Sequence, residues 1–140
     1  MRQILDRLIL SDLGQANDPF FLSQNDVQAI LYFGDGGMFP DDIKLYHRPA
    51  LPDGTLTTEM LRDGVVFLRE SLAAGRRVLA VGPTGATIVA VYLTEMGFSP
   101  AQAIQMLAEA RDLGISPDIS LLNEHNEAMQ RRSHTTLGHR

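Results

Sequence analysis

One stretch of the sequence constrains the fold more than any other. Residues 78–81 form a short continuous hydrophobic run, typical of a buried strand, and residues 82–85 carry the glycines and proline of a loop. Residues 86–96 are apolar nearly all round, which predicts a helix at the centre of the domain rather than on its surface. A buried strand that leads into a buried helix indicates an α/β domain.

Three further runs predict strands. Residues 8–10 indicate a short edge strand, and residues 27–33 indicate a central strand that stops at the glycine-rich turn 34–37. Residues 43–47 form the next strand.

Capping residues and apolar spacing predict the remaining helices. Asp18 followed by Pro19 starts a short helix, and residues 57–72 form a long surface helix that ends before Gly75. Ser99, with a proline next and a glutamine three residues later, starts another helix that runs to Gly114. A last helix is expected from about residue 116 to residue 129.

Length and composition fit one globular domain. The chain has 140 residues, of which 44% are hydrophobic and 21% charged. We expect a single domain over residues 1–130 and a flexible polar tail over residues 131–140. The longest apolar runs of the chain fall far short of the roughly 20 residues needed to cross a bilayer. The first residues also lack the apolar core of a secretory signal, so a cytoplasmic location is expected.

Charge and residue content exclude several functions. A net charge of −5 argues against nucleic-acid binding, which needs a basic face. The chain has no cysteine, so disulfides, thiolate metal sites and cysteine nucleophiles are excluded. His125 lies near Glu124 and Glu127, but no second histidine stands one helical turn away, and a solvated helix face is the better interpretation. Neither a metal nor a cofactor is predicted.

The segment that follows the buried strand is the candidate binding site. A strand that passes through a glycine-bearing loop into a helix directs backbone N–H groups and the positive end of the helix dipole at one spot. Nucleotide-binding P-loops use this layout, but here Thr87, Ile88 and Val89 stand where glycine, lysine and a hydroxyl residue are required. Nucleotide hydrolysis is therefore not expected.

Cysteine-dependent phosphatases share the same layout, and the chain resembles dual-specificity phosphatases over nearly its whole length. Residues 5–10 resemble the first strand of that family, residues 27–33 its next strand, and residues 51–53 its acid-bearing loop. Residues 76–103 are similar to its signature strand, loop and helix, and to the turn into the following helix. The resemblance implies a central, mainly parallel sheet flanked by helices.

The catalytic signature of that family is not retained. Its signature is His-Cys, five residues, then Arg and Ser or Thr, and only Gly85 matches it. Gly82 stands at the nucleophilic cysteine, Ile88 at the phosphate-binding arginine and Val89 at the hydroxyl residue. Glycine, isoleucine and valine cannot attack phosphorus, hold phosphate oxygens bidentately or assist release of a thiol. The resemblance therefore implies a degenerate member without catalysis.

Two other sets of residues are candidates for catalysis. Asp53 lies where the family places its general acid, but the turn-forming triplet Pro52-Asp53-Gly54 favours a purely structural role, so Asp53 is at most a relic. Thr84 and Thr87 carry the hydroxyls of the loop, and a threonine nucleophile would need a base such as His47 or His125 within reach.

The expected function is therefore that of a pseudophosphatase, a binding or regulatory module with a phosphorylated ligand or a protein partner. An alternative is a hydrolase of different chemistry that uses Asp53 with Thr84 and Thr87, and a third is a structural or oligomerisation module. The sequence gives no oligomeric state. The expected anion-binding loop consists of Gly82, Pro83, Thr84, Gly85, Ala86, Thr87 and Ile88.

Overall fold

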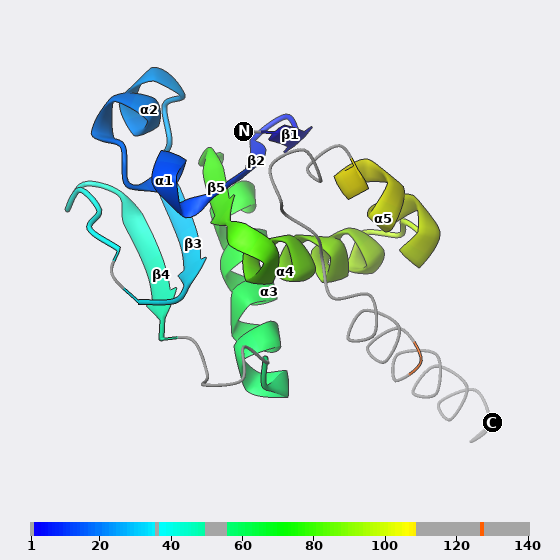
Figure 1. Ribbon diagram of the computed structural model, residues 1–140. Coiled ribbons are helices and arrows are strands. Elements are labelled where there is room, and N and C mark those ends of the chain that lie inside the picture. Colours follow the sequence, from blue (N-terminus) through cyan, green and yellow to red (C-terminus); the bar gives the residue numbers. More distant parts are fainter. Residues whose placement is uncertain (1, 36, 50–55, 109–126, 128–140) are drawn as a thin grey trace.

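The computed structural model describes residues 2–35, 37–49, 56–108 and 127 (Figure 1). Five strands form one sheet in the order β1-β2-β5-β3-β4. β1 pairs antiparallel with β2, and every other pair is parallel. The strands are β1 Arg2–Leu5, β2 Leu8–Ser11, β3 Ala29–Phe33, β4 Lys44–Arg48 and β5 Val78–Val81. The predicted α/β fold with a mainly parallel sheet is confirmed.

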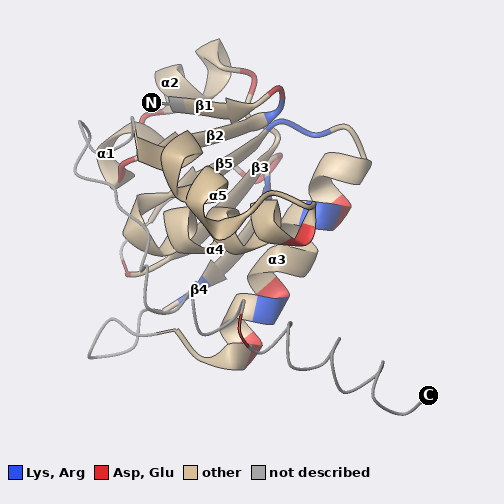
Figure 2. Ribbon diagram, turned by 90° about the vertical axis from the view of Figure 1, so that its right-hand side faces the viewer, with Lys and Arg blue, Asp and Glu red and all other residues tan. Residues whose placement is uncertain are grey.

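Helices cover both faces of this sheet. Two short helices, α1 Leu13–Ala16 and α2 Pro19–Gln24, lie on one face, and α3 Thr58–Ala73, α4 Gly82–Glu95 and α5 Pro100–Leu107 lie on the other (Figures 1 and 2). Because successive strand residues point to opposite faces, each strand contributes to two cores. In β5, Val78 and Ala80 belong to the larger core under α3, α4 and α5, whereas Leu79 belongs to the smaller core under α1 and α2.

The predicted helix caps are confirmed. The Asp18 carboxylate accepts from the Phe20 N–H at 3.0 Å, with proline at the first position of α2. Ser99 and Gln102 form the full capping box, in which the serine hydroxyl accepts from the Gln102 N–H at 3.1 Å and the glutamine oxygen accepts from the Ser99 N–H at 2.8 Å. Each cap supplies partners for N–H groups that the first helical turn leaves unbonded.

The prediction of a buried central helix is also confirmed, but its start is not. Every residue of α4 from 85 to 91 is buried, and the helix contacts α3, α5 and three strands. However, α4 begins at Gly82, directly after β5, so the expected loop over residues 82–85 is wrong. These residues form the first turn of α4, which Pro83 permits because proline is tolerated in the first turn of a helix.

The segment 8–10 was expected at the edge of the sheet, but β2 lies between β1 and β5, and Leu8, Ile9 and Leu10 are fully buried. The reason is the preceding strand β1, which pairs with β2 and occupies the edge.

The expected helix over 116–129, the stop at Gly114 and the boundary of the tail lie outside the described residues, apart from Glu127. In the described part, no helix is long and apolar enough to cross a membrane.

Candidate functional site

The candidate site is the junction between β5 and α4. Val81, at the N-cap position, gives no side-chain hydrogen bond to the first turn of α4. The N–H groups of that turn therefore receive no cap from Val81 and stand at the positive end of the helix dipole. Gly82 has φ +72°, in the left-handed region that favours glycine, although a Cβ added there would meet nothing within 4 Å. Glycine at this position thus meets a backbone requirement rather than a lack of space.

The two threonines of the segment differ in environment. Thr87 is 2% exposed, and its hydroxyl donates to the Pro83 carbonyl oxygen at 3.0 Å, one helical turn earlier. Thr84 is half-buried. Since the Thr87 hydroxyl is buried and bonded to the helix backbone, Thr84 is the more accessible of the two. Asp53, the relic acid position, lies outside the described residues.

The positions that the resemblance aligns with the arginine and the hydroxyl residue belong to the hydrophobic core. Ile88 and Val89 are both fully buried. Ile88 packs against α3 at Gly64, where an added Cβ would lie 2.7 Å from the Ile88 Cδ1. The side chain that the resemblance aligns with the arginine is therefore packed against α3 in the core.

Gly85, the one residue that matches the family signature, has a packing role. A Cβ added at Gly85 would lie 3.1 Å from the carbonyl carbon of Ala80 in β5. The glycine therefore allows the first turn of α4 to approach the strand closely.

His47, considered as a base for a threonine nucleophile, lies elsewhere. Its Nε2 is 2.6 Å from the Gly34 carbonyl oxygen, and because a carbonyl can only accept, Nε2 donates. Its ring stacks on Tyr32, with centroids 5.0 Å apart, and Tyr32 belongs to the core under α1 and α2. The opposite face of the sheet carries α4, so the structure does not bring His47 to Thr84 or Thr87.

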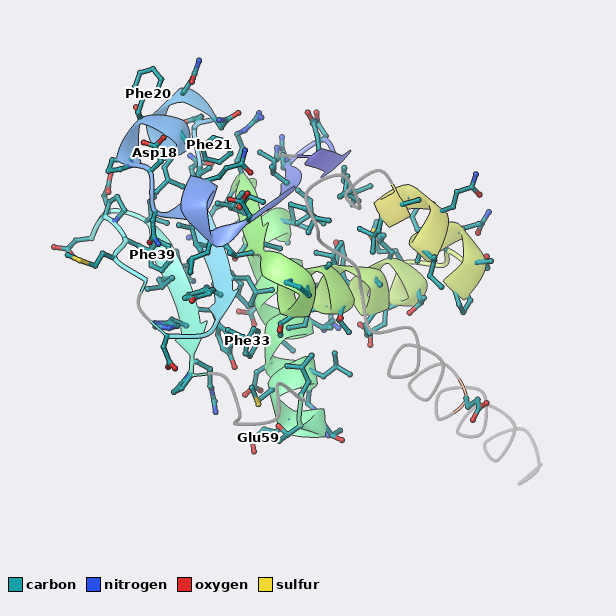
Figure 3. All side chains as sticks on the ribbon, in the orientation of Figure 1. Asp18, Phe20, Phe21, Phe33, Phe39 and Glu59 are labelled. Carbon is teal, nitrogen blue, oxygen red and sulfur yellow. The ribbon has the colours of Figure 1, made fainter. Side chains whose placement is uncertain are left out.

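Tyr32 organises the turn that follows β3. Its hydroxyl donates to the Asp35 carbonyl oxygen at 2.7 Å. Its ring meets the ring of Phe39, which is labelled in Figure 3, edge to face. Burial, and to a smaller extent the Asp35 carboxylate, raises the pKa of Tyr32 above its usual value of 10.0. The tyrosine is neutral at physiological pH and acts as a structural hydrogen-bond donor.

An arginine that the sequence did not single out lies at the same edge of the sheet as Gly82. Arg48, the last residue of β4, forms an ion pair with Asp63 of α3 at 3.2 Å, and its guanidinium lies 5.8 Å from the centre of the Tyr46 ring. Burial raises the pKa of Tyr46. The two partners are fifteen positions apart, which left no sequence signal for this contact between β4 and α3.

Metal binding gains no support in the described residues. Among them, no group of three or more histidine, aspartate or glutamate side chains could hold a metal ion. Glu124 and His125 are not among the residues that the structure describes.

Comparison with known proteins rests on structure alone. No family model and no curated protein matches the sequence. Among solved structures, human DUSP28 is 20% identical, with a TM-score of 0.78 over 93% of this chain and 98% of that one. DUSP15 is 19% identical, with a TM-score of 0.79 over 100% of this chain and 96% of that one.

A third similar structure is the human tyrosine phosphatase-like serine/threonine/tyrosine-interacting protein. It is 17% identical, with a TM-score of 0.76 over 93% of this chain and 95% of that one. Likeness at these low identities establishes the fold. The chain therefore has the fold of dual-specificity phosphatases.

Proposed function

We propose that this protein is a catalytically inactive, phosphatase-like binding module. The observation that carries the proposal is that Ile88, which the resemblance aligns with the phosphate-binding arginine, is fully buried and packed on Gly64. If an arginine had simply been lost from the surface, the cleft could still be polar. A buried isoleucine at this position instead contributes to the hydrophobic core, so the apolar side chain is part of the fold. With no cysteine in the chain, the family's nucleophile is also missing.

Weak anion binding at the start of α4 is the second part of the proposal. The N–H groups of the first turn have no cap from Val81, so a phosphate oxygen could accept from them. Charge-assisted arginine contacts are roughly twice as strong as neutral hydrogen bonds, and the resemblance aligns Ile88, not an arginine, with the phosphate-binding position. We therefore expect phosphate to bind weakly, with a dissociation constant of about 1 mM or higher. A dissociation constant of 1 mM corresponds to a binding free energy of about −4 kcal/mol.

The test is an amide chemical-shift titration with phosphate and then with phosphotyrosine. Saturable shifts are expected in residues 82–88, while phosphorus NMR of the same sample shows no hydrolysis. The start of α5 is an internal control, because the Gln102 N–H already donates to Ser99 and its shift should not change.

Two outcomes would count against separate parts of the proposal. Without shifts in residues 82–88, the anion site is refuted, and the binding role would have to use another surface. Turnover that disappears on Thr84→Ala or Asp53→Ala would refute the inactive module and favour a hydrolase of different chemistry. A variant of an exposed residue of α3, Glu70→Gln, controls for contaminating phosphatase, whose activity it would leave unchanged.

A further inference from the structure

The outer edge of β4 carries backbone groups that the sheet leaves unbonded. β4 is the last strand of the sheet, at its bottom in Figure 2. The Lys44 N–H donates to the Gln28 carbonyl oxygen, just before β3, at 3.0 Å. Because the backbone groups of successive strand residues point to opposite sides, the first, third and fifth residues of β4 face β3, and Leu45 and His47 face outward. The N–H and C=O groups of Leu45 and His47 form no hydrogen bond with another described residue.

β4 is also more exposed than is usual for a strand of a parallel sheet, since such strands are normally covered on both faces. Four of its five residues are exposed, and Leu45, on the face that carries α1 and α2, is 42% exposed. The pairing of β4 with β3 runs over all five residues without a bulge. At the other edge of the sheet, a register shift between Gln3 and Leu5 interrupts β1. Of the two edges, that of β4 is therefore the one that a further strand can extend.

A second copy of β4 fits this edge in one antiparallel register. With Tyr46 opposite Tyr46 of the second copy, Leu45 lies opposite His47 in both directions, and every outward N–H and C=O group finds a partner. A register centred on Leu45 brings in Ile43, whose N–H is already bonded in the preceding turn. A register centred on His47 brings in Pro49, which has no N–H. Tyr46 is therefore the centre that leaves none of the outward groups of β4 unbonded.

The side chains that this register places opposite one another are compatible. Opposite residues of antiparallel strands point to the same face, and aromatic and apolar pairs stabilise a sheet. The two Tyr46 rings meet on the face that carries α3, where Tyr46 already packs on Phe67 with ring centroids 5.7 Å apart. On the other face, the exposed Leu45 side chain meets the His47 ring of the second copy.

The charges of β4 do not oppose this register. Lys44 lies opposite Arg48 of the second copy, and like charges directly opposite each other would destabilise the pair. However, the Arg48 guanidinium already pairs with the Asp63 carboxylate at 3.2 Å. The carboxylate therefore offsets the repulsion that Lys44 would otherwise meet.

We propose that two copies of this protein associate through the outer edges of their β4 strands, with Tyr46 on the twofold axis and the two sheets joined into one. Each copy uses the same surface, so the contact closes on itself and assembly stops at the dimer. The inference goes beyond the binding role proposed above. Because the edge of β4 does not include the start of α4, the dimer and the anion site can fail separately.

The register is tested with introduced cysteines, since the chain has none of its own. Residues of a hydrogen-bonded pair lie about 5.5 Å apart at Cα, a separation that a disulfide can bridge. Under mild oxidation, a mixture of Leu45→Cys and His47→Cys proteins should crosslink to each other, and each protein alone should crosslink far less. Ala101→Cys measures chance collision, because Ala101 is exposed on α5, which lies across the molecule from β4 (Figure 1). Leu45→Cys that crosslinks with itself as readily as with His47→Cys would refute this register.

Self-association is measured by sedimentation velocity of the wild type at increasing protein concentration. Leu45→Pro removes an outward N–H from each copy and should weaken the dimer about tenfold or more. The fold should survive, because proline is tolerated on an edge strand where the missing N–H faces solvent. Leu45→Val keeps the N–H and the apolar side chain and should alter the dissociation constant less than about twofold.

Two outcomes would overturn the proposal. One is a wild type that stays monomeric at every concentration, which would leave the edge of β4 to an extended segment of another protein. The other is a Leu45→Pro variant that associates as tightly as Leu45→Val, which would place the contact between copies on another surface.

Discussion

The packing of Ile88 on Gly64 can be tested by adding one methyl group. In Gly64→Ala, the new Cβ would lie 2.7 Å from the Ile88 Cδ1 and 3.1 Å from its Cγ2, in a fully buried contact. Overpacking of a core costs about 2 kcal/mol, and alanine regains about 1 kcal/mol over glycine in a helix. The net loss should be about 1 kcal/mol, or about 3–4 °C in melting temperature.

A double-mutant cycle with Ile88→Val isolates this contact. Ile88→Val alone should cost about 1 kcal/mol, but in the Gly64→Ala background it removes the clashing methyl, so the two changes should couple by about 1 kcal/mol. Urea unfolding of the four proteins measures the coupling. Gly14→Ala in α1 is the control, because its Cβ would make only ordinary contact, at 3.4 Å from the nearest atom. A stabilised Gly64→Ala without coupling would show that Ile88 does not face α3.

Three further changes test other parts of the fold. Gly85→Ala should cost about 1–2 kcal/mol in urea unfolding, since its Cβ would press on the Ala80 backbone at 3.1 Å. Ser99→Ala should cost about 1 kcal/mol in the same assay through loss of the capping box. Burial raises the pKa of Tyr32 above 10.0, so its contribution to stability is fully present below pH 10.0 and is lost as the pH rises beyond that value. Tyr32→Phe should therefore lose less stability than the wild type between neutral and alkaline pH. Thermal melts across that pH range measure the difference.

Much of the fold was predictable because its signals are local. The Asp18 and Ser99 caps act within three residues of sequence, so the starts of α2 and α5 could be read directly from it. The apolar character of residues 86–96 likewise predicted the burial of α4, because a helix without a polar face has to be covered. These signals are short-range, and they agree with the tertiary structure.

The sheet edge was missed because its signal is weak. β1 has only four residues, and a register shift between Gln3 and Leu5 interrupts its pairing with β2. A short irregular strand shows little of the alternation by which strands are recognised. Without β1, residues 8–10 were placed at the edge, although their full burial requires a neighbour on both sides.

The start of α4 was misplaced because two glycines and a proline usually indicate a loop, and here tertiary packing gives each another role. Gly82 meets the left-handed backbone conformation, Pro83 fits the first turn, and Gly85 allows close approach to Ala80. In the family signature that it matches, Gly85 belongs to the phosphate-binding loop, whereas here it is explained by contact between strand and helix. A match at Gly85 therefore supports the shared fold and gives no information about anion binding, which only the titration of residues 82–88 can decide.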